Sequence, residues 1–479
     1  MISFIISICV LIIGYFTYGK FIERIFGVEK NRETPAVRLR DDVDFVPLSA
    51  WKIFLIQFLN IAGLGPIFGA IAGAMFGPAS FLWIVFGSIF AGAVHDYLSG
   101  MLSVRHDGLS ISEIVGIYLG GKMKQIMRLF TVILLIFVGT VFLIGPAKII
   151  DGMTGNVCGI WIWVGIILVY YVLSTLLPID KIISKLYPVF GVAMLLMAIG
   201  LLIPLLFGDY HIPELVPGNI RNMTTYPEAS PLFPILFVTI ACGAISGFHA
   251  TQSPLMARCM KNESLGRKIF YGTMITEGIV ALIWAAAAMT FFGNVSELNA
   301  AMLANDNNAA WAANEISLNM LGGIGGILAL LGLVAAPITS GDTAFRSARL
   351  ILSDVFKSDQ KKIKNRLFIS FPLFVIAFAL TQIDFGIIWR YFAWSNQTLA
   401  TVVLWTITAY LIYESKAYWV TLFPALFMTM VCSSYILVSP EGFNLPNDIS
   451  YLGGALITVC TSLIFWFYTL RKKKDFAAI

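Results

Sequence analysis

The sequence predicts an all-α polytopic membrane protein, and three observations carry that prediction. Of its 479 residues, 58% are hydrophobic and 12% are charged, and the mean hydropathy is +0.84; soluble domains carry about 25% charged residues. Apolar runs of about 17 to 25 residues, long enough to cross the hydrocarbon core as a helix, recur from end to end. These runs do not alternate with period two, as the strands of a membrane barrel would.

The apolar runs predict about thirteen transmembrane helices. The first run lacks a basic start and a small-residue cleavage site, so we expect it to be a retained span and not a signal peptide. The expected spans lie near residues 2–18, 53–77, 79–101, 129–147, 160–177, 188–207, 232–254, 269–292, 321–340, 367–383, 386–413, 418–438 and 451–470.

The positions of Lys and Arg predict how these spans are oriented, because cytoplasmic loops carry an excess of both. If residues 19–52 are cytoplasmic, every second loop should be basic, and 29 of the 32 Lys and Arg residues fall on that side. The exceptions are Lys148, Arg221 and Arg390. The pattern predicts an N-terminus outside and a C-terminus in the cytoplasm, and it explains the net charge of +5 without nucleic-acid binding.

Two spans carry signals that interrupt a helix. Span 53–77 contains Gly63-Leu64-Gly65-Pro66, and Pro66 suits the start of a second half-helix. Glycines follow at a spacing of four from residue 65 to 77, which predicts close helix packing. Span 232–254 leads into GAISGFHATQSPLM, where Ser253-Pro254 is typical of an N-cap and first helical residue. A plain proline kink is the alternative for each.

The two interruptions lie five spans apart in helices of opposite predicted direction. Such a pair is typical of secondary transporters built from inverted repeats. The sequence then divides into a first helix with a basic loop (1–52), two five-helix repeats (53–231 and 232–413) and two C-terminal helices with a basic tail (414–479).

Polar groups inside the spans are candidate sites, because ionisable residues there are rare and usually functional. The candidates for ion coupling are His95, Asp96, Glu277, Thr339, Ser340, Asp342 and Thr343. The candidates for substrate binding are Gly63, Gly65, Pro66, His249, Thr251, Gln252, Ser253, Asn396 and Gln397.

Each ionisable candidate has a structural alternative. His95-Asp96 would then be an interfacial pair wetted by the cytosol, Glu277 a group bonded to a neighbouring helix, and Asp342 the partner of Arg346 in a helical ion pair. Soluble-enzyme motifs are incomplete: GIYLGGK lacks the Ser or Thr of a phosphate loop. The four His and six Cys show no metal-binding spacing, so we expect no enzyme activity, metal or cofactor.

Four blocks of the chain resemble the carbon-starvation protein A (CstA) family of bacterial membrane transporters. They are GPIFGAIAGAMFGPASFLWIVFGSIFAGAVHDYLSGMLSVRHDG, GAISGFHATQSPLMARCM, APITSGDTAFRSARLIL and WRYFAWSNQTLATVVLW. The resemblance runs from about residue 53 to 412. It implies the amino acid/polyamine/organocation transporter fold in a bacterial cytoplasmic membrane. Family members are associated with uptake of peptides or pyruvate, with proton coupling proposed for the pyruvate carriers.

These observations predict a secondary transporter that imports a small carboxylate-bearing nutrient, pyruvate or short peptides, by alternating access. Coupling to a cation is expected, with a proton favoured and sodium possible. Half-helix N-termini would offer free N–H groups to the carboxylate. A channel and a membrane-embedded starvation sensor are the alternatives. A channel needs a continuous polar face along several helices, and a sensor usually adds a soluble output domain.

Overall fold

The computed structural model describes residues 1–476 apart from 42–43, 156, 177–178, 323–324, 359 and 361. In that part of the chain every regular element is helical, as predicted. The α-helices are α1 Ile2–Phe16, α2 Tyr18–Phe26, α3 Pro35–Arg38, α4 Ala50–Ile61, α5 Ala70–Ala74, α6 Ala79–Leu82, α7 Ala93–Arg105, α8 Ile111–Leu119, α9 Gly121–Met153, α10 Ile160–Leu176, α11 Ile179–Phe207, α12 Phe237–Thr239, α13 Gly247–Ala257, α14 Gly272–Phe291, α15 Val295–Ala304, α16 Ala309–Met320, α17 Gly325–Ala329, α18 Ala336–Phe356, α19 Ile363–Leu380, α20 Phe385–Tyr413, α21 Trp419–Val438 and α22 Asn447–Phe476.

Short segments of other helical types join several of these helices. The π-helical segments are Gly65–Gly69, Trp83–Gly92, Leu232–Leu236, Arg267–Tyr271 and Leu330–Ala335, and Glu263–Leu265 is a 3₁₀ turn. π-Helical turns within a helix frequently lie at functional sites.

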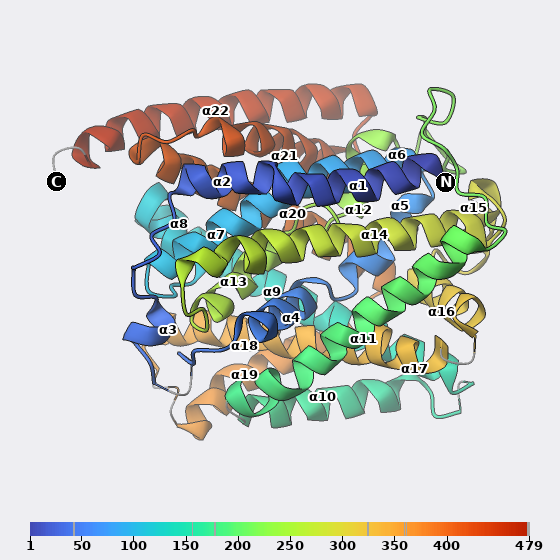
Figure 1. Ribbon diagram of the computed structural model, residues 1–479, viewed down its shortest axis with the longest axis horizontal. Coiled ribbons are helices and arrows are strands. Elements are labelled where there is room, and N and C mark those ends of the chain that lie inside the picture. The colour runs from blue at the N-terminus through green and yellow to red at the C-terminus, as the bar shows by residue number, and fades with distance from the viewer. Residues whose placement is uncertain are drawn as a thin grey trace.

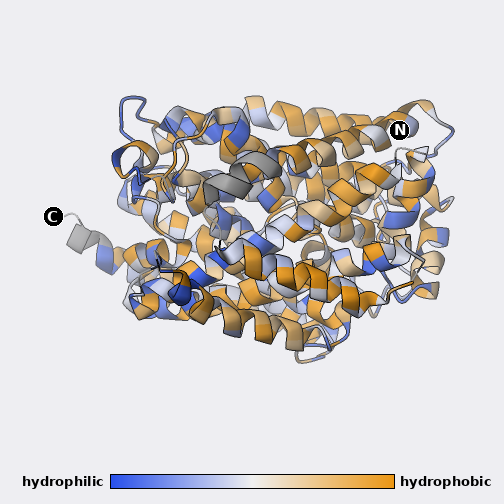
Figure 2. Cartoon of the chain, turned by 90° about the horizontal axis from the view of Figure 1, so that it is seen from below, coloured by the Kyte–Doolittle hydropathy of each residue, from blue (hydrophilic) through white to orange (hydrophobic). Residues whose placement is uncertain are grey.

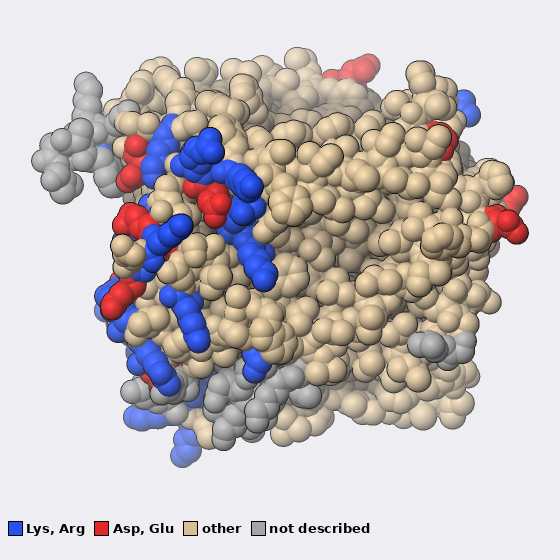
Figure 3. All heavy atoms as spheres, viewed as in Figure 1, with Lys and Arg blue, Asp and Glu red and all other residues tan. Residues whose placement is uncertain are grey.

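The helices form a bundle whose surface suits a bilayer. The long helices run broadly along one direction, and the two ends of the chain lie at opposite ends of the bundle (Figure 1). On the face shown in Figure 3, Lys and Arg gather at the end of the bundle where α22 ends, and the rest of that face carries almost no charge. Apolar residues dominate the helices and polar ones the connecting loops (Figure 2). The outer helices α1, α19 and α22 expose Ile, Leu and Phe side chains, as lipid contact requires.

Among the described residues, nine continuous helices are long and apolar enough to cross a membrane, and a bent pair makes a possible tenth. The expected span 160–177 is the shorter apolar helix α10, and 386–413 is the continuous helix α20. The structure therefore supports a multi-pass membrane protein, and the count of about thirteen spans stays a prediction.

The first predicted interruption is confirmed. α4 ends at Ile61, and the helix resumes as a π-helical turn at Gly65 after a bend of 55° between the two halves. Pro66 stands at the start of the second half, as predicted. Proline is tolerated there because its missing N–H would have no helical partner in any case.

The second predicted interruption also exists, but its predicted position at Ser253-Pro254 is wrong. α12 ends at Thr239, residues 240–246 are not helical, and α13 continues unbroken past Pro254 to Ala257. Ser253 caps no helix; its hydroxyl donates to the His249 carbonyl at 3.1 Å. Local bonding of this kind within a helix is what the plain-kink alternative describes. The break precedes the Ser-Pro pair.

Glycines explain where the second break lies. A Cβ at Gly243 would lie 2.6 Å from the Cβ of Ala281 on α14, and one at Gly247 would lie 2.5 Å from the backbone nitrogen of Ala400 on α20. Real Cβ atoms do not approach so closely, so only glycine lets the chain pass between these two helices. The break is therefore fixed by backbone packing.

The two broken helices pack directly against each other. A Cβ at Gly65 would collide with the side chain of Cys242, and one at Gly69 would lie 2.9 Å from the Thr239 carbonyl oxygen. The glycine face predicted for close packing thus meets the residues that lead into the second break, and both breaks share one place in the bundle.

Candidate functional site

Side chains from α20 hold both sides of the second break. The side-chain oxygen Oδ1 of Asn396 accepts from the backbone N–H of Phe248, in the first turn of α13, at 2.6 Å. The Gln397 amide donates to the Phe237 carbonyl at 3.3 Å, in α12. Both α20 residues are buried. The structure therefore places these two substrate-binding candidates on backbone groups of the break.

Two further side chains satisfy carbonyls within the break. The Trp83 indole donates to the Ile240 carbonyl at 3.1 Å, and the Ser88 hydroxyl donates to the Gly243 carbonyl at 3.0 Å. Non-helical backbone at membrane depth needs such partners. The irregular segment is thus a well-bonded part of the bundle.

A buried cluster of acids and histidines lies beside the break. Asp96 on α7 accepts from Nδ1 of His95 and from Nδ1 of His249, each at 2.8 Å. Nε2 of His249 lies 3.4 Å from Oε2 of Glu277 on α14. All four side chains have an exposed fraction of 0%. We name His95, Asp96, His249 and Glu277 the acid–histidine cluster.

The cluster unites predicted residues that belong to different sequence motifs. Asp96 and Glu277 were candidates for ion coupling, whereas His249 was a candidate for substrate binding. Their burial rules out the alternative in which His95-Asp96 is wetted by the cytosol. In the described structure, the ion pairs of Asp96 and Glu277 are with histidine only.

Several buried polar atoms near the breaks have no hydrogen-bond partner in the structure. They include both side-chain polar atoms of Gln57 and of Asn60 on α4, and Oε1 of Gln252 on α13. α4 contacts both α13 and α14. Buried amides normally find partners, so this region is suited to a polar guest. Gln57 and Asn60 were not predicted as site residues; the available signal was two amides three residues apart within an apolar run.

The remaining α13 candidates bond locally. The Thr251 hydroxyl donates to the Phe248 carbonyl at 2.7 Å, as Ser253 does to His249. Both hydroxyls thereby use their proton on the backbone of their own helix. Gln252 differs, because only its amide nitrogen has a partner, Thr251 Oγ1 at 2.9 Å.

The α18 candidates connect helices. The Ser340 hydroxyl donates to the Leu59 carbonyl at 2.9 Å, near the end of α4. Asp342 accepts from the Tyr187 hydroxyl at 2.9 Å. Thr339 and Thr343 donate to carbonyls of their own helix. The Arg346 guanidinium donates to the Ser174 carbonyl at 3.4 Å, so the structure gives it a partner other than Asp342.

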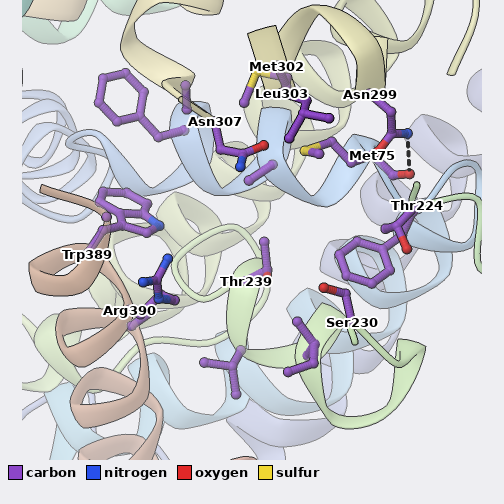
Figure 4. Close-up of a pocket in the computed structure, with 18 of the residues that line it drawn as sticks. Met75, Thr224, Ser230, Thr239, Asn299, Met302, Leu303, Asn307, Trp389 and Arg390 are labelled. Atoms are coloured by element: carbon purple, nitrogen blue, oxygen red, sulfur yellow. Dashed lines mark hydrogen bonds between the residues drawn. The ribbon is translucent and has the colours of Figure 1, made fainter. Parts of the chain in front are cut away.

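A cavity of about 350 Å³ is lined by residues beside both breaks and by α15, and α15 lies at the end of the bundle remote from the last turns of α22 (Figure 1). Its walls include Phe68 beside the first break, Thr239 at the end of α12, and Asn299 on α15. Figure 4 shows Trp389 and Arg390 of α20 on one side and Thr224 with Asn299 on the other. The side-chain candidates of the sequence analysis lie among the buried groups, and the wall residues were not predicted as a site.

Arg390 gives the cavity wall a positive group. Its guanidinium pairs through Nε with Glu441, and its side chain is 47% exposed. In the sequence Arg390 stands out as an exception to the charge pattern. Its position six residues after the aspartate that caps the start of α20 was too weak a signal to find the cavity.

A group of ion pairs lies at the opposite end of the bundle. Arg105, the last residue of α7, donates through Nε to Glu263 at 3.2 Å, and its guanidinium covers the Phe26 ring at 4.0 Å. Glu263 is fully buried and also accepts from the Glu29 N–H at 3.0 Å. We name Arg105, Glu263, Glu29 and Phe26 the inner seal.

Comparison with known proteins identifies relatives. The model of the family described as "Carbon starvation protein CstA" matches residues 1–203 and 159–323. A Haemophilus influenzae protein named as an uncharacterized membrane protein is 43% identical over 351 residues, 64% of this chain and 95% of that protein. The peptide transporter CstA of Campylobacter jejuni is 26% identical, across 94% of this chain and 82% of the relative.

Two more comparisons extend this result. The pyruvate/proton symporter BtsT of Escherichia coli is 28% identical over 351 residues. The matched part is 59% of this chain and 48% of that protein. A manganese transporter from Eremococcus coleocola has a similar fold, with a TM-score of 0.54 at 13% identity over 91% of this chain and 99% of that one. Because the relatives with named activities are transporters, they support transport and not catalysis. The chain belongs to the carbon starvation protein CstA family.

Proposed function

We propose that the protein imports a small carboxylate-bearing solute, pyruvate or a short peptide, across the bacterial cytoplasmic membrane. The acid–histidine cluster, buried beside two broken helices, is the observation that carries this proposal. Buried carboxylates are costly within a membrane and are found where ions or protons move. The names of the CstA and BtsT relatives support both solute classes.

Solute enters through the cavity in this proposal. The orientation is the predicted one, with the basic end in the cytoplasm and the N-terminus outside. Glu441 pairs with Nε of Arg390, so other guanidinium N–H groups of Arg390 can bind the carboxylate of the solute. Phe68 and Thr239 in the cavity wall then bring the solute to the two breaks.

The inner binding groups are the unpartnered amides and the first half-helix. Gln57, Asn60 and Gln252 offer donors and acceptors without local partners. The N-terminal turn at Gly65-Pro66 adds the positive end of a helix dipole. Asn396 already occupies the Phe248 N–H at the start of α13, so we assign Asn396 and Gln397 to positioning the break.

The acid–histidine cluster couples transport to a cation, and a proton is favoured over sodium. Two carboxylates share two histidines, so the cluster can accept positive charge. Imidazole nitrogen binds protons readily, whereas sodium prefers several oxygen ligands. The hydroxyls of Thr339 and Ser340, candidates for ion coupling, donate to carbonyls and keep oxygen lone pairs for a cation, so sodium stays the alternative.

Alternating access rests on the two repeats in this proposal. Residues 53–231 and 232–413 form five-helix units that contribute one broken helix each. Closure of the cavity and opening of the inner seal would move the binding groups from one side to the other. The inner seal argues against a channel, which would need passage at both ends.

Uptake into proteoliposomes tests the proposal. Labelled pyruvate and labelled dialanine are each supplied with an inward proton gradient, an inward sodium gradient or no gradient. We expect accumulation of at least one solute under the proton gradient only. Accumulation under the sodium gradient alone would identify sodium, and not the proton, as the coupling ion. No accumulation of either solute under either gradient would refute the proposal.

A further inference from the structure

Cys242, His249 and Glu277 form a donor set that neither the sequence analysis nor the relatives assign. One ligand atom from each residue, the thiol sulfur, an imidazole nitrogen and a carboxylate oxygen, lies within 4.8 Å of the others. The residues come from the second break, α13 and α14, and all are buried. We propose that this set binds one zinc-class divalent cation.

The orientation of His249 suits metal binding. Its Nδ1 is bonded to Oδ2 of Asp96 at 2.8 Å, which favours the tautomer whose Nε2 carries a free lone pair. Metal-bound histidines usually donate their other nitrogen to a carboxylate in this manner. Nε2 has no hydrogen-bond partner, and it lies 3.4 Å from Oε2 of Glu277.

Glu277 supplies a second ligand group whose oxygen atoms have no hydrogen-bond partner. Both of its carboxylate oxygens lack a hydrogen-bond partner although the side chain is fully buried. A buried polar atom without a partner costs free energy. A cation placed between Nε2 of His249 and the carboxylate would satisfy both residues at once.

Cys242 supplies the third ligand atom, a sulfur. A Cys242 thiolate and a Glu277 carboxylate together balance a divalent ion, and the Asn396 amide donates to Cys242 Sγ at 3.4 Å. Sulfur, imidazole and carboxylate are the ligands that zinc takes, with about 2.0–2.3 Å bonds that small side-chain shifts would provide. Three protein ligands leave a fourth position open. Hard cations such as Mg²⁺ prefer sets made of oxygen alone.

The site shares His249 and Glu277 with the proposed coupling cluster, so metal and proton would compete for the same lone pairs. The binding itself does not rest on the proposed transport function. Metal binding is therefore measured on the purified full-length protein in detergent, without substrate, gradient or vesicles. Uptake assays can then fail or succeed independently of this result.

Cobalt and zinc are the probes. Co²⁺ is titrated into metal-stripped protein, where a thiolate ligand produces a charge-transfer absorption band, and Zn²⁺ is then added to displace it. Bound Zn²⁺ per chain is counted by mass spectrometry after removal of free metal. The variants are Cys242→Ser and Glu277→Gln. Cys432→Ser is the matched control, because Cys432 is a buried thiol within 3.5 Å of the Thr401 hydroxyl and is not a member of the donor set.

We expect one Zn²⁺ per chain and a cobalt–thiolate band in the wild type and in Cys432→Ser. Cys242→Ser should lose the band, and both site variants should bind Zn²⁺ at least tenfold more weakly while keeping wild-type helical circular dichroism and a single gel-filtration peak. Absence of stoichiometric Zn²⁺ from the wild type, or an unchanged affinity in Cys242→Ser, overturns the proposal. If a variant does not fold, the wild-type cobalt band alone decides whether a thiolate ligates the metal, and Cys242→Ala replaces the serine variant.

Discussion

Asp96 joins two helices through one carboxylate. It accepts from His95 of its own helix α7 and from His249 of α13, and His249 in turn faces Glu277 of α14. A change of charge at any member is therefore felt by three helices, two of which border the second break. This connection gives a physical route from cation binding to a change of conformation.

Glu277→Gln keeps the shape of the side chain and removes its charge. We expect proton-driven accumulation of solute to fall at least tenfold, whereas exchange of internal for external solute continues, because exchange needs no net release of the cation. Both are measured in the same proteoliposomes. The control is Glu297→Gln, which lies outside the cluster near the start of α15. Equal loss of accumulation in both variants would contradict a coupling role for Glu277.

The sequence identified these residues as candidates and did not predict that they lie together. Ionisable groups inside apolar runs are visible in the sequence, so His95, Asp96, Glu277 and His249 were all candidates. Their contacts join positions 153 residues apart along the chain, and no local pattern reports such a distance. The unpartnered amides Gln57 and Asn60 were missed for a related reason, since lack of a partner is a property of packing.

At the scale of helices, the two breaks depend on glycine and on α20. The Ser-Pro signal misplaced the second break because its chemistry also suits the inside of a helix, where Ser253 bonds the His249 carbonyl. Gly243 and Gly247 mark the true position, since α14 and α20 leave no room for a Cβ. The first break was predicted correctly because its glycines and proline stand together.

Gly65→Ala tests the contact between the breaks. The added methyl group would collide with Cys242, and overpacking of this kind typically costs about 1–3 kcal/mol. The control is Gly165→Ala on α10, where the new Cβ meets open space and helix propensity rises. We expect a lower thermal midpoint in detergent for Gly65→Ala and an equal or higher one for the control; equal midpoints would exclude close contact at Gly65.

Asn396→Ala tests how the second break is held. It leaves the Phe248 N–H without its partner, and an unsatisfied buried donor costs about 1–3 kcal/mol. Asn319→Ala on the surface of α16 is the matched control. Denaturation followed by circular dichroism should show a loss of stability for the first variant only, and a neutral Asn396→Ala would remove this residue from the support of the break.

At the scale of the whole molecule, a cavity lies at one end and the inner seal at the other, as the proposed alternating access requires of one of its states. Sequence patterns predicted the all-α class and the gathering of basic residues at one end (Figure 3). They did not reveal the seal, because Arg105 and Glu263 are 158 residues apart. The repeat organisation stays a prediction of the inverted pair of breaks.

Glu263→Gln weakens the seal by removing the negative partner of Arg105. We expect a shift toward the state open at the basic end, seen as faster labelling of Cys259 by a thiol reagent in a background without the exposed Cys9, Cys158 and Cys460. Cys259 is buried, and its carbonyl accepts from the Leu48 N–H of the covering loop. Unchanged labelling would show that the seal does not hold this end closed.

The central claim is that solute movement and proton movement are one process carried by the acid–histidine cluster. Its most direct test records internal pH with a trapped dye while pyruvate or dialanine is added outside proteoliposomes held at equal pH. We predict that solute acidifies the interior of wild-type vesicles and leaves the pH of Glu277→Gln vesicles unchanged. Solute uptake by the wild type without acidification, or equal acidification in Glu277→Gln, would contradict the claim.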